Sequence, residues 1–107
     1  MAFAVYILAS GRNGTLYIGH TDDLHRRMVE HRAHHFKGFT AKHRVEKLVW
    51  FEDHETREAA FLRERQMKKW RRIWKLELIE RLNSQWRDLF LDIEVVLDTT
   101  GSPLSRG

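Results

Sequence analysis

The chain contains no cysteine, which excludes disulfide bonds and any metal site built from thiolates. It has no apolar run that approaches the length of a membrane span, and its N-terminus lacks a charged region followed by a cleavable apolar stretch. Internal repeats are absent as well. These absences lead us to expect a cytoplasmic protein with no membrane partner, stabilised by an ordinary packed core.

The 107 residues are enough for one small domain, and a hydrophobic content of 42% can fill a core of that size. We place this domain at residues 1–91 and a C-terminal extension at residues 92–107, partly disordered because its last residues are polar. The net charge of +4 favours a polyanionic partner, nucleic acid first. Charge alone does not assign that function, since many small basic domains bind no nucleic acid specifically.

Two strands joined by a short turn are predicted at the N-terminus, over Ala2–Leu8 and Thr15–His20. The segment 10–14 between them carries glycine and Asn-Gly signals, which suit a strand reversal. In a regular hairpin, Tyr6 and Tyr17 can then lie across from each other on one face of the sheet.

A helix is predicted after the hairpin, from about residue 22 to residue 34 or 35, with Thr21 as its N-cap. Residues three and four apart lie on one side of a helix. Here they form a stripe of apolar and histidine side chains: Leu24, Met28, His31 and His35. Arg27 borders the stripe one turn before His31, whereas Arg26 points toward solvent. The pattern aims two phenols, one guanidinium and one imidazole at a common place, a set suited to holding and cutting a phosphodiester.

Beyond this helix, the sequence predicts one more strand and two more helices. Val45–Phe51 is rich in residues that favour strands, and a helix opens after it near Asp53 or Glu55-Thr56. The apolar face of that helix is formed by Ala59, Ala60, Leu62, Met67 and Trp70. The last helix covers about Arg72–Leu82, and Asn83 is a natural stop for it.

Glu64 lies on the flank of that apolar face, a position in which a carboxylate can be partly desolvated. A carboxylate in such a place suits a divalent metal ion, and a salt bridge to a neighbouring arginine is the plainer interpretation. Trp70, Ile73 and Trp74 sit at helical spacing within a basic segment. We expect these three side chains in the core, with the charges facing water.

Basic residues are interleaved with aromatic ones over residues 36–44. We interpret this segment as a loop along a phosphate backbone, with Phe36 or Phe39 free to stack on a base. A solvated connection whose phenylalanines fill the edge of the domain is the equally weighted alternative. The candidate nucleic-acid contacts are Lys37, Lys42, His43, Arg44 and Lys68.

Taken in order, these motifs resemble the GIY-YIG nuclease domain over roughly residues 3–89. The first triad of that family is usually Gly-Ile-Tyr and is Ala4-Val5-Tyr6 here, whereas the second, Tyr17-Ile18-Gly19, is intact. The helix pattern Asp-Leu-x-x-Arg-x-x-x-His falls on residues 23–31. The change at Ala4 removes backbone freedom but no reactive group.

Two later segments add to the resemblance. Residues 60–70 read Ala-x-x-x-Glu-x-x-Met-Lys-Lys-Trp and look like the metal-glutamate helix of the family. Asn83-x-x-Trp86 looks like the closing asparagine element of its small stand-alone members. The resemblance implies an α+β fold, a small three-stranded antiparallel sheet flanked by about three helices. It also implies divalent-metal-dependent cleavage of DNA, with a place in repair or recombination.

The resemblance implies a catalytic set of Tyr6, Tyr17, Arg27, His31, Glu64 and Asn83. Glu64 would hold one Mg²⁺ or Mn²⁺, and Arg27 would neutralise charge on the phosphoryl oxygens. Tyr6 would activate the attacking water, while Tyr17 and His31 would position the phosphate or relay a proton.

The base in this mechanism stays open at this point, because a free phenol titrates near pH ~10. Either the charges of Arg27 and the metal favour phenolate at Tyr6, or the proton is relayed through His31. The main alternative function is a module of the same fold that binds DNA or RNA without cutting it. A scaffold that dimerises or binds a partner protein through Trp86, Phe90 and residues 93–97 is the other.

Overall fold

The computed structural model describes residues 3–33 and 44–93 of the chain. Its elements are, in chain order, β1 Phe3–Ala9, β2 Leu16–Thr21, α1 Leu24–Arg32, β3 Lys47–His54, α3 Arg57–Lys68 and α4 Arg72–Leu82. The strands form one antiparallel sheet in the order β2-β1-β3, and a short helical turn covers residues 90–93. The predicted fold class, a three-stranded antiparallel sheet flanked by helices, is confirmed.

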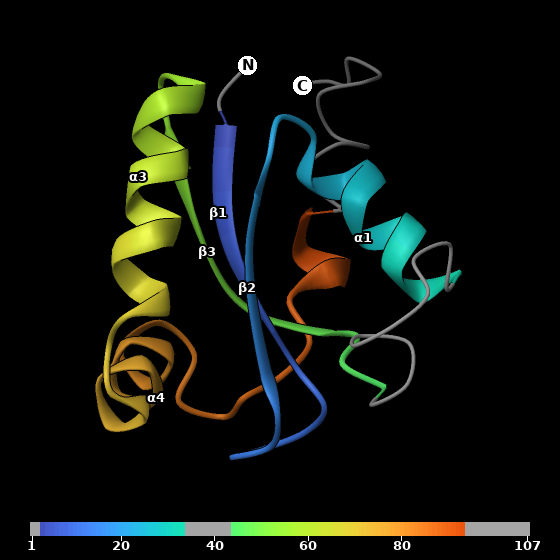
Figure 1. The fold of residues 1–107 in the computed structure, drawn as a ribbon. Coiled ribbons are helices and arrows are strands. Elements are labelled where there is room, and N and C mark those ends of the chain that lie inside the picture. The colour runs from blue at the N-terminus through green and yellow to red at the C-terminus, as the bar shows by residue number, and fades with distance from the viewer. Residues whose placement is uncertain (1–2, 34–43, 94–107) are drawn as a thin grey trace.

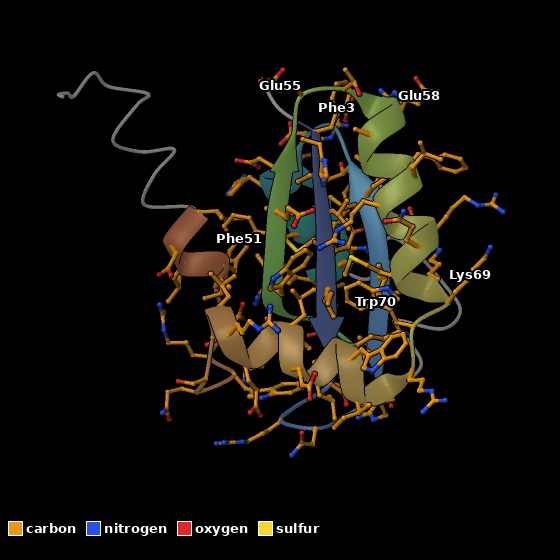
Figure 2. The ribbon with its side chains drawn as sticks, turned by 90° about the vertical axis from the view of Figure 1, so that its left-hand side faces the viewer. Phe3, Phe51, Glu55, Glu58, Lys69 and Trp70 are labelled. Atoms are coloured by element: carbon orange, nitrogen blue, oxygen red, sulfur yellow. The ribbon has the colours of Figure 1, made fainter. Side chains whose placement is uncertain are left out.

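Helices cover both faces of the sheet (Figure 1). α3 and α4 lie on one face, and α1 and the turn at residues 90–93 lie on the other. Figure 2 shows α3 and α4 in front of the strands. The central strand β1 is therefore buried on both sides, which explains its continuous run of large apolar residues. Val5 and Ile7 face α3 and α4, whereas Tyr6 and Leu8 pack with α1.

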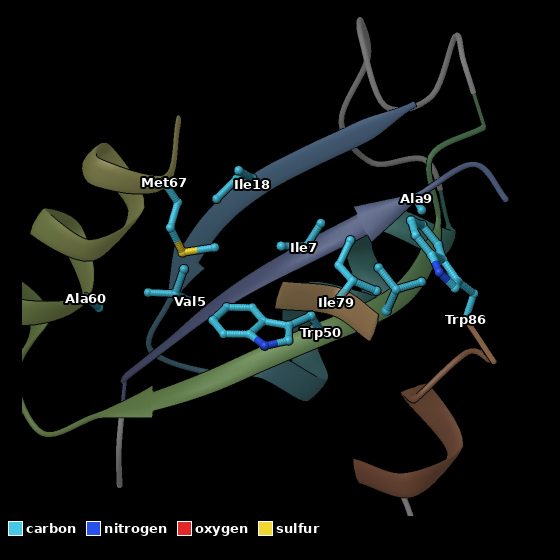
Figure 3. Packing of buried hydrophobic residues seen from close by; sticks show 10 residues of the cluster. Val5, Ile7, Ala9, Ile18, Trp50, Ala60, Met67, Ile79 and Trp86 are labelled. Atoms are coloured by element: carbon cyan, nitrogen blue, oxygen red, sulfur yellow. The ribbon is translucent and has the colours of Figure 1, made fainter. Parts of the chain in front are cut away.

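The larger core cluster joins all three strands to α3 and α4 (Figure 3). Its members are Val5, Ile7, Ala9, Ile18, Val49, Trp50, Ala60, Met67, Ile79 and Trp86. The smaller cluster on the α1 side contains Tyr6, Leu8, Met28, Val45, Leu48 and Leu89. One tyrosine of the predicted site is thus part of the hydrophobic packing that holds α1 to the sheet.

The pairing of β1 with β2 places Tyr6 opposite Gly19 and Leu8 opposite Tyr17. Paired residues of antiparallel strands point to the same face, so both tyrosines face α1. They are diagonal neighbours, however, and not directly opposite each other as the hairpin pattern suggested. β3 begins and ends later than the predicted strand at Val45–Phe51.

The start of α1 differs from the prediction. Asp23, and not Thr21, is the N-cap, and its side chain accepts a hydrogen bond from the backbone N–H of Arg26 at 3.1 Å. β2 continues through Thr21, whose hydroxyl accepts a hydrogen bond from the Asp23 backbone N–H at 3.1 Å, so the helix begins later. α1 ends at Arg32, and residues 34 and 35 lie outside the described residues.

Three side chains predicted to be in the core are largely exposed: Leu62, Ile73 and Trp74. The cause is the orientation of the two helices. α3 turns Ala60, Glu64 and Met67 toward the sheet, which leaves Leu62 outside. α4 contacts the core through the buried Ile79 and the partly buried Leu76 and Leu78, so the residues of its first turn lie beyond the contact. Trp70 is partly buried against the edge of the larger cluster.

The outer edge of β3 is sealed by the segment that follows α4. Asn83 donates from its side-chain amide to the carbonyls of Val49, at 3.2 Å, and Arg87, at 2.7 Å. Its amide oxygen accepts from the Arg87 backbone N–H at 3.1 Å. The Leu89 backbone N–H donates to the Leu48 carbonyl at 2.8 Å. These bonds satisfy backbone groups on the outer edge of β3, where no further strand of the described residues pairs with it.

We predict that Asn83→Ala lowers the free energy of unfolding by about 2–3 kcal/mol, because buried backbone groups lose their partners. Chemical denaturation measures the change. Ser84→Ala is the matched control, since Ser84 is the exposed next residue, and it should change stability by less than about 0.5 kcal/mol. Equal stability of the two variants would contradict this structural role for Asn83.

Candidate active site

Two tyrosines and one histidine form an aromatic cluster between the sheet and α1. β1 supplies Tyr6, β2 supplies Tyr17 and α1 supplies His31. The ring centroids are 6.3 Å apart for the two tyrosines, 6.0 Å for Tyr6 and His31, and 5.6 Å for Tyr17 and His31. The Tyr6 hydroxyl lies 3.4 Å from Nε2 of His31. The three rings are in mutual contact, so a change at one reaches the other two.

The members of the cluster differ in their access to solvent. Tyr6 is 1% exposed and His31 is also buried, whereas Tyr17 is half-buried. The Arg27 side chain is 32% exposed, against 59% for Arg26. A bound molecule therefore meets Tyr17 and Arg27 first, with Tyr6 and His31 behind them.

Gly19 allows the close approach of the Tyr6 ring to β2. A Cβ atom at Gly19 would lie 2.6 Å from the Tyr6 hydroxyl oxygen and 2.7 Å from Cζ of the same ring. It would also lie 3.2 Å from Cε2 of Tyr17. The glycine of the second triad is thus required by space, because any side chain would displace the tyrosine beside it.

The surroundings move the pKa values of Tyr6 and His31 apart. Burial, the neighbouring Tyr17 and the charge of Glu64 raise the pKa of the Tyr6 hydroxyl, and Arg27 opposes them only in part. Burial and the charge of Arg27 lower the pKa of His31 from its ordinary 6.5, and Glu30 opposes them. Near neutral pH, Tyr6 is therefore a phenol beside a neutral imidazole.

Glu64 lies on α3, on the other face of the sheet, and is 8% exposed. Its carboxylate contacts Nδ1 of His20 and the ammonium of Lys68. Burial raises the pKa of Glu64, but the hydrogen bonds and charges of Lys68 and His20 outweigh burial, so this pKa lies below its ordinary value. The carboxyl group is therefore an anion at neutral pH.

The two halves of the site are separated by the edge strand β2. Tyr6 and Tyr17 lie on its α1 side, and Glu64 lies on its α3 side. The charge of Glu64 still contributes to the raised pKa of Tyr6. The charge of the carboxylate therefore acts on the Tyr6 hydroxyl across this edge of the sheet.

The residues around Glu64 fit a hydrated divalent ion. The described part of the chain contains no group of three or more histidine, aspartate or glutamate side chains placed to hold a metal. Mg²⁺ needs no such group, because it keeps several waters and binds through one or two carboxylates. Glu64 supplies one ionised carboxylate at a hollow of about 300 Å³, where Lys68 already balances its charge. A cation would compete with Lys68 for this position.

The other predicted site residues do not join the aromatic cluster. Asn83 directs its amide to the backbone of Val49 and Arg87. Arg44 is exposed, with a φ of 57°. Lys68 contacts Glu64. The remaining candidate nucleic-acid contacts lie outside the described residues: Lys37, Lys42 and His43.

The sequence reasoning overlooked His20. Strand alternation carries the signal that could have found it, because Tyr17 and Gly19 face α1 and the residue between Gly19 and Thr21 must face α3. A polar side chain on the covered face of a strand needs a partner, and here the partner is Glu64.

Residues 2–77 match the family model of the GIY-YIG catalytic domain, so the chain belongs to the GIY-YIG family of nucleases. The UPF0213 protein HQ_3675A of Haloquadratum walsbyi is 38% identical over 76 residues, which cover 71% of this chain and 84% of that protein. The solution structure of the UPF0213 protein BH0048 of Bacillus halodurans is similar in fold, with a TM-score of 0.52 and 23% identity over the whole of both chains. The family acts on nucleic acid and generally uses divalent metals.

No helix within residues 3–33 and 44–93 has both the length and the apolar character that crossing a bilayer requires.

We predict that Gly19→Ala destabilises the fold by about 1–3 kcal/mol, because the new methyl group overpacks the buried Tyr6 ring. Thermal and chemical unfolding measure this loss. Gly11→Ala is the matched control, since a Cβ at Gly11 meets nothing within 4 Å. Two variants of equal stability would show that the Tyr6 ring can move away from β2.

We also predict a pH dependence of stability that depends on His31. Its pKa is lower in the folded chain than the ordinary 6.5, so the unfolded chain binds more protons between the two values. The free energy of unfolding should therefore fall as the pH is lowered below 6.5. Denaturation curves at several pH values should show a smaller fall for His31→Gln. Equal pH dependence in both chains would contradict the prediction.

Proposed function

We propose that this chain is a divalent-metal-dependent endonuclease that hydrolyses phosphodiester bonds in DNA. The observation that carries the proposal is the cluster of Tyr6, Tyr17 and His31, bordered by Arg27, with the ionised Glu64 across the edge strand β2. An arginine and a carboxylate that both act on one buried phenol are not explained by hydrophobic packing. Metal-assisted phosphodiester hydrolysis uses a cation at the phosphate, an acceptor for a proton and an anion that holds the metal.

We assign the binding of the divalent ion to Glu64, with His20 holding the carboxylate in place. When bound, such an ion polarises a phosphoryl oxygen and stabilises the charge that develops on it. Arg27 borders the aromatic cluster with a partly exposed side chain, and we assign to it the neutralisation of the same charge. Mg²⁺ and Mn²⁺ both suit a single carboxylate with water ligands.

We assign the contact with the attacking water to Tyr17 instead of Tyr6, because Tyr6 is almost fully buried. The proton of this water could pass to a Tyr6 phenolate or be relayed through His31, and the directions of the two pKa shifts favour the relay through His31. The raised pKa of Tyr6 disfavours phenolate, whereas His31 is neutral near pH 7 and can accept a proton. The Tyr6 hydroxyl lies 3.4 Å from Nε2 of His31 and so helps to orient the imidazole ring. Asn83 acts at a distance, by holding β3 in position.

We predict that the purified chain cleaves DNA in the presence of Mg²⁺ or Mn²⁺ and that Glu64→Gln abolishes this activity. Labelled single-stranded, duplex and branched DNA, with an RNA strand of the same sequence, are the substrates. Glu58→Gln is the matched control, because Glu58 is exposed in the first turn of α3, and it should cleave as the parent does. Mn²⁺ should raise the unfolding temperature of the parent more than that of Glu64→Gln.

The same assay separates the two neighbouring arginines of α1. Arg27→Ala should lower the cleavage rate by about 100- to 1,000-fold, because a group that stabilises transition-state charge is lost. Arg26→Ala should change it little, since the Arg26 side chain is 59% exposed, against 32% for Arg27, and pairs with Asp22. Equal loss in both variants would contradict the assignment of Arg27. Salt-sensitive DNA binding without any cleavage would favour the non-cleaving module.

A further inference from the structure

One hollow of the surface lies directly beside Glu64, along α3. It has a volume of about 300 Å³ and is lined by Phe61, Glu64, Arg65, Lys68 and Lys69. Three of these side chains are positive and one is negative, so the hollow is electropositive. The fifth is an aromatic ring that is 42% exposed.

The Phe61 ring is held in place while part of it remains accessible. His20 contacts it edge-on, with centroids 5.7 Å apart and an angle of 70° between the rings. The guanidinium carbon of Arg65 lies 5.5 Å from the centroid of the Phe61 ring. His20 also contacts Glu64 through Nδ1, so the same imidazole fixes both the ring and the carboxylate. The exposed ring is therefore coupled to the proposed metal ligand.

The composition of this hollow distinguishes it from another of similar volume, about 300 Å³, at Trp70 and Trp74. That hollow has aromatic rings, but its charged residues are Glu77 and Arg81, which cancel. An aromatic face together with an excess of positive charge is the combination that binds unpaired nucleotides. The bases stack on the ring, and the phosphates lie against the cations.

We propose that this hollow binds an unpaired nucleotide next to the phosphate that is cleaved. The base stacks on Phe61, and the adjoining phosphates contact Arg65 and Lys69. This inference rests on the proposed nuclease function and narrows its substrate. Inside a duplex, both faces of a base are covered by its neighbours, so a base can reach Phe61 only from a single strand, a flap or a branch.

The test is binding of a branched DNA that carries 2-aminopurine at the unpaired position beside the junction, measured in EDTA so that no cleavage occurs. The parent should quench the 2-aminopurine fluorescence, because 2-aminopurine fluoresces less when it is stacked on a ring than when it is free. Phe61→Ala should lose the quenching and bind about tenfold more weakly. Phe61→Tyr keeps an aromatic ring and should restore both.

Leu62→Ala is the matched control. Leu62 is the next residue of α3, is 53% exposed and does not line the hollow, so this variant should bind and quench as the parent does. Phe61→Ala should bind a fully paired duplex of the same length within about twofold of the parent. Circular dichroism of each variant checks that the fold is kept.

The outcomes separate this inference from the proposed function. Equal binding and quenching by Phe61→Ala and Leu62→Ala would overturn the inference, even in a chain that cleaves DNA. A parent that shows no quenching would overturn it too. Quenching that depends on Phe61, in a chain that never cleaves with Mg²⁺ or Mn²⁺, would support the inference and overturn the proposed function.

Discussion

The contact between the Tyr6 ring and the bare backbone of Gly19 is the constraint on which the site depends. β1 and β2 pair in a register that sets Tyr6 opposite Gly19 and Tyr6 and Tyr17 diagonally on one face, and only a residue without a side chain leaves room for the Tyr6 ring there. α1 then packs Met28 and His31 against that face, and the phase of the helix puts Arg27 at its border. The absence of a side chain at Gly19 therefore allows the phenols of Tyr6 and Tyr17, the His31 imidazole and the Arg27 guanidinium to gather at one place.

Opposite charges hold the second half of the site together. Glu64 is buried enough that an isolated carboxylate would be unfavourable, and His20 and Lys68 compensate it from β2 and from the next turn of α3. One strand of the sheet separates this anion from the phenols. Its charge still contributes to the raised pKa of Tyr6. Because β2 is an edge strand, a ligand that lies along it can touch both halves.

Features that depend on local periodicity could be predicted from the sequence: the fold class, the shared face of Tyr6 and Tyr17, and the inward phase of His31 on α1. Features that depend on how elements meet could not. Trp74 has the spacing of a core residue but lies beyond the contact of α4 with the sheet. The near-complete burial of Tyr6 results from the packing of α1, which strand alternation does not describe.

The seal along β3 means that the unit that folds is longer than the unit that the family match defines. The match ends at residue 77, but the carbonyls of Leu48 and Val49 are satisfied from Leu89 and Asn83. During synthesis, this strand keeps open backbone groups until the segment after α4 has left the ribosome. A chain truncated at residue 77 would expose unpaired backbone groups on the edge of β3, and such an edge tends to pair with the same edge of another copy.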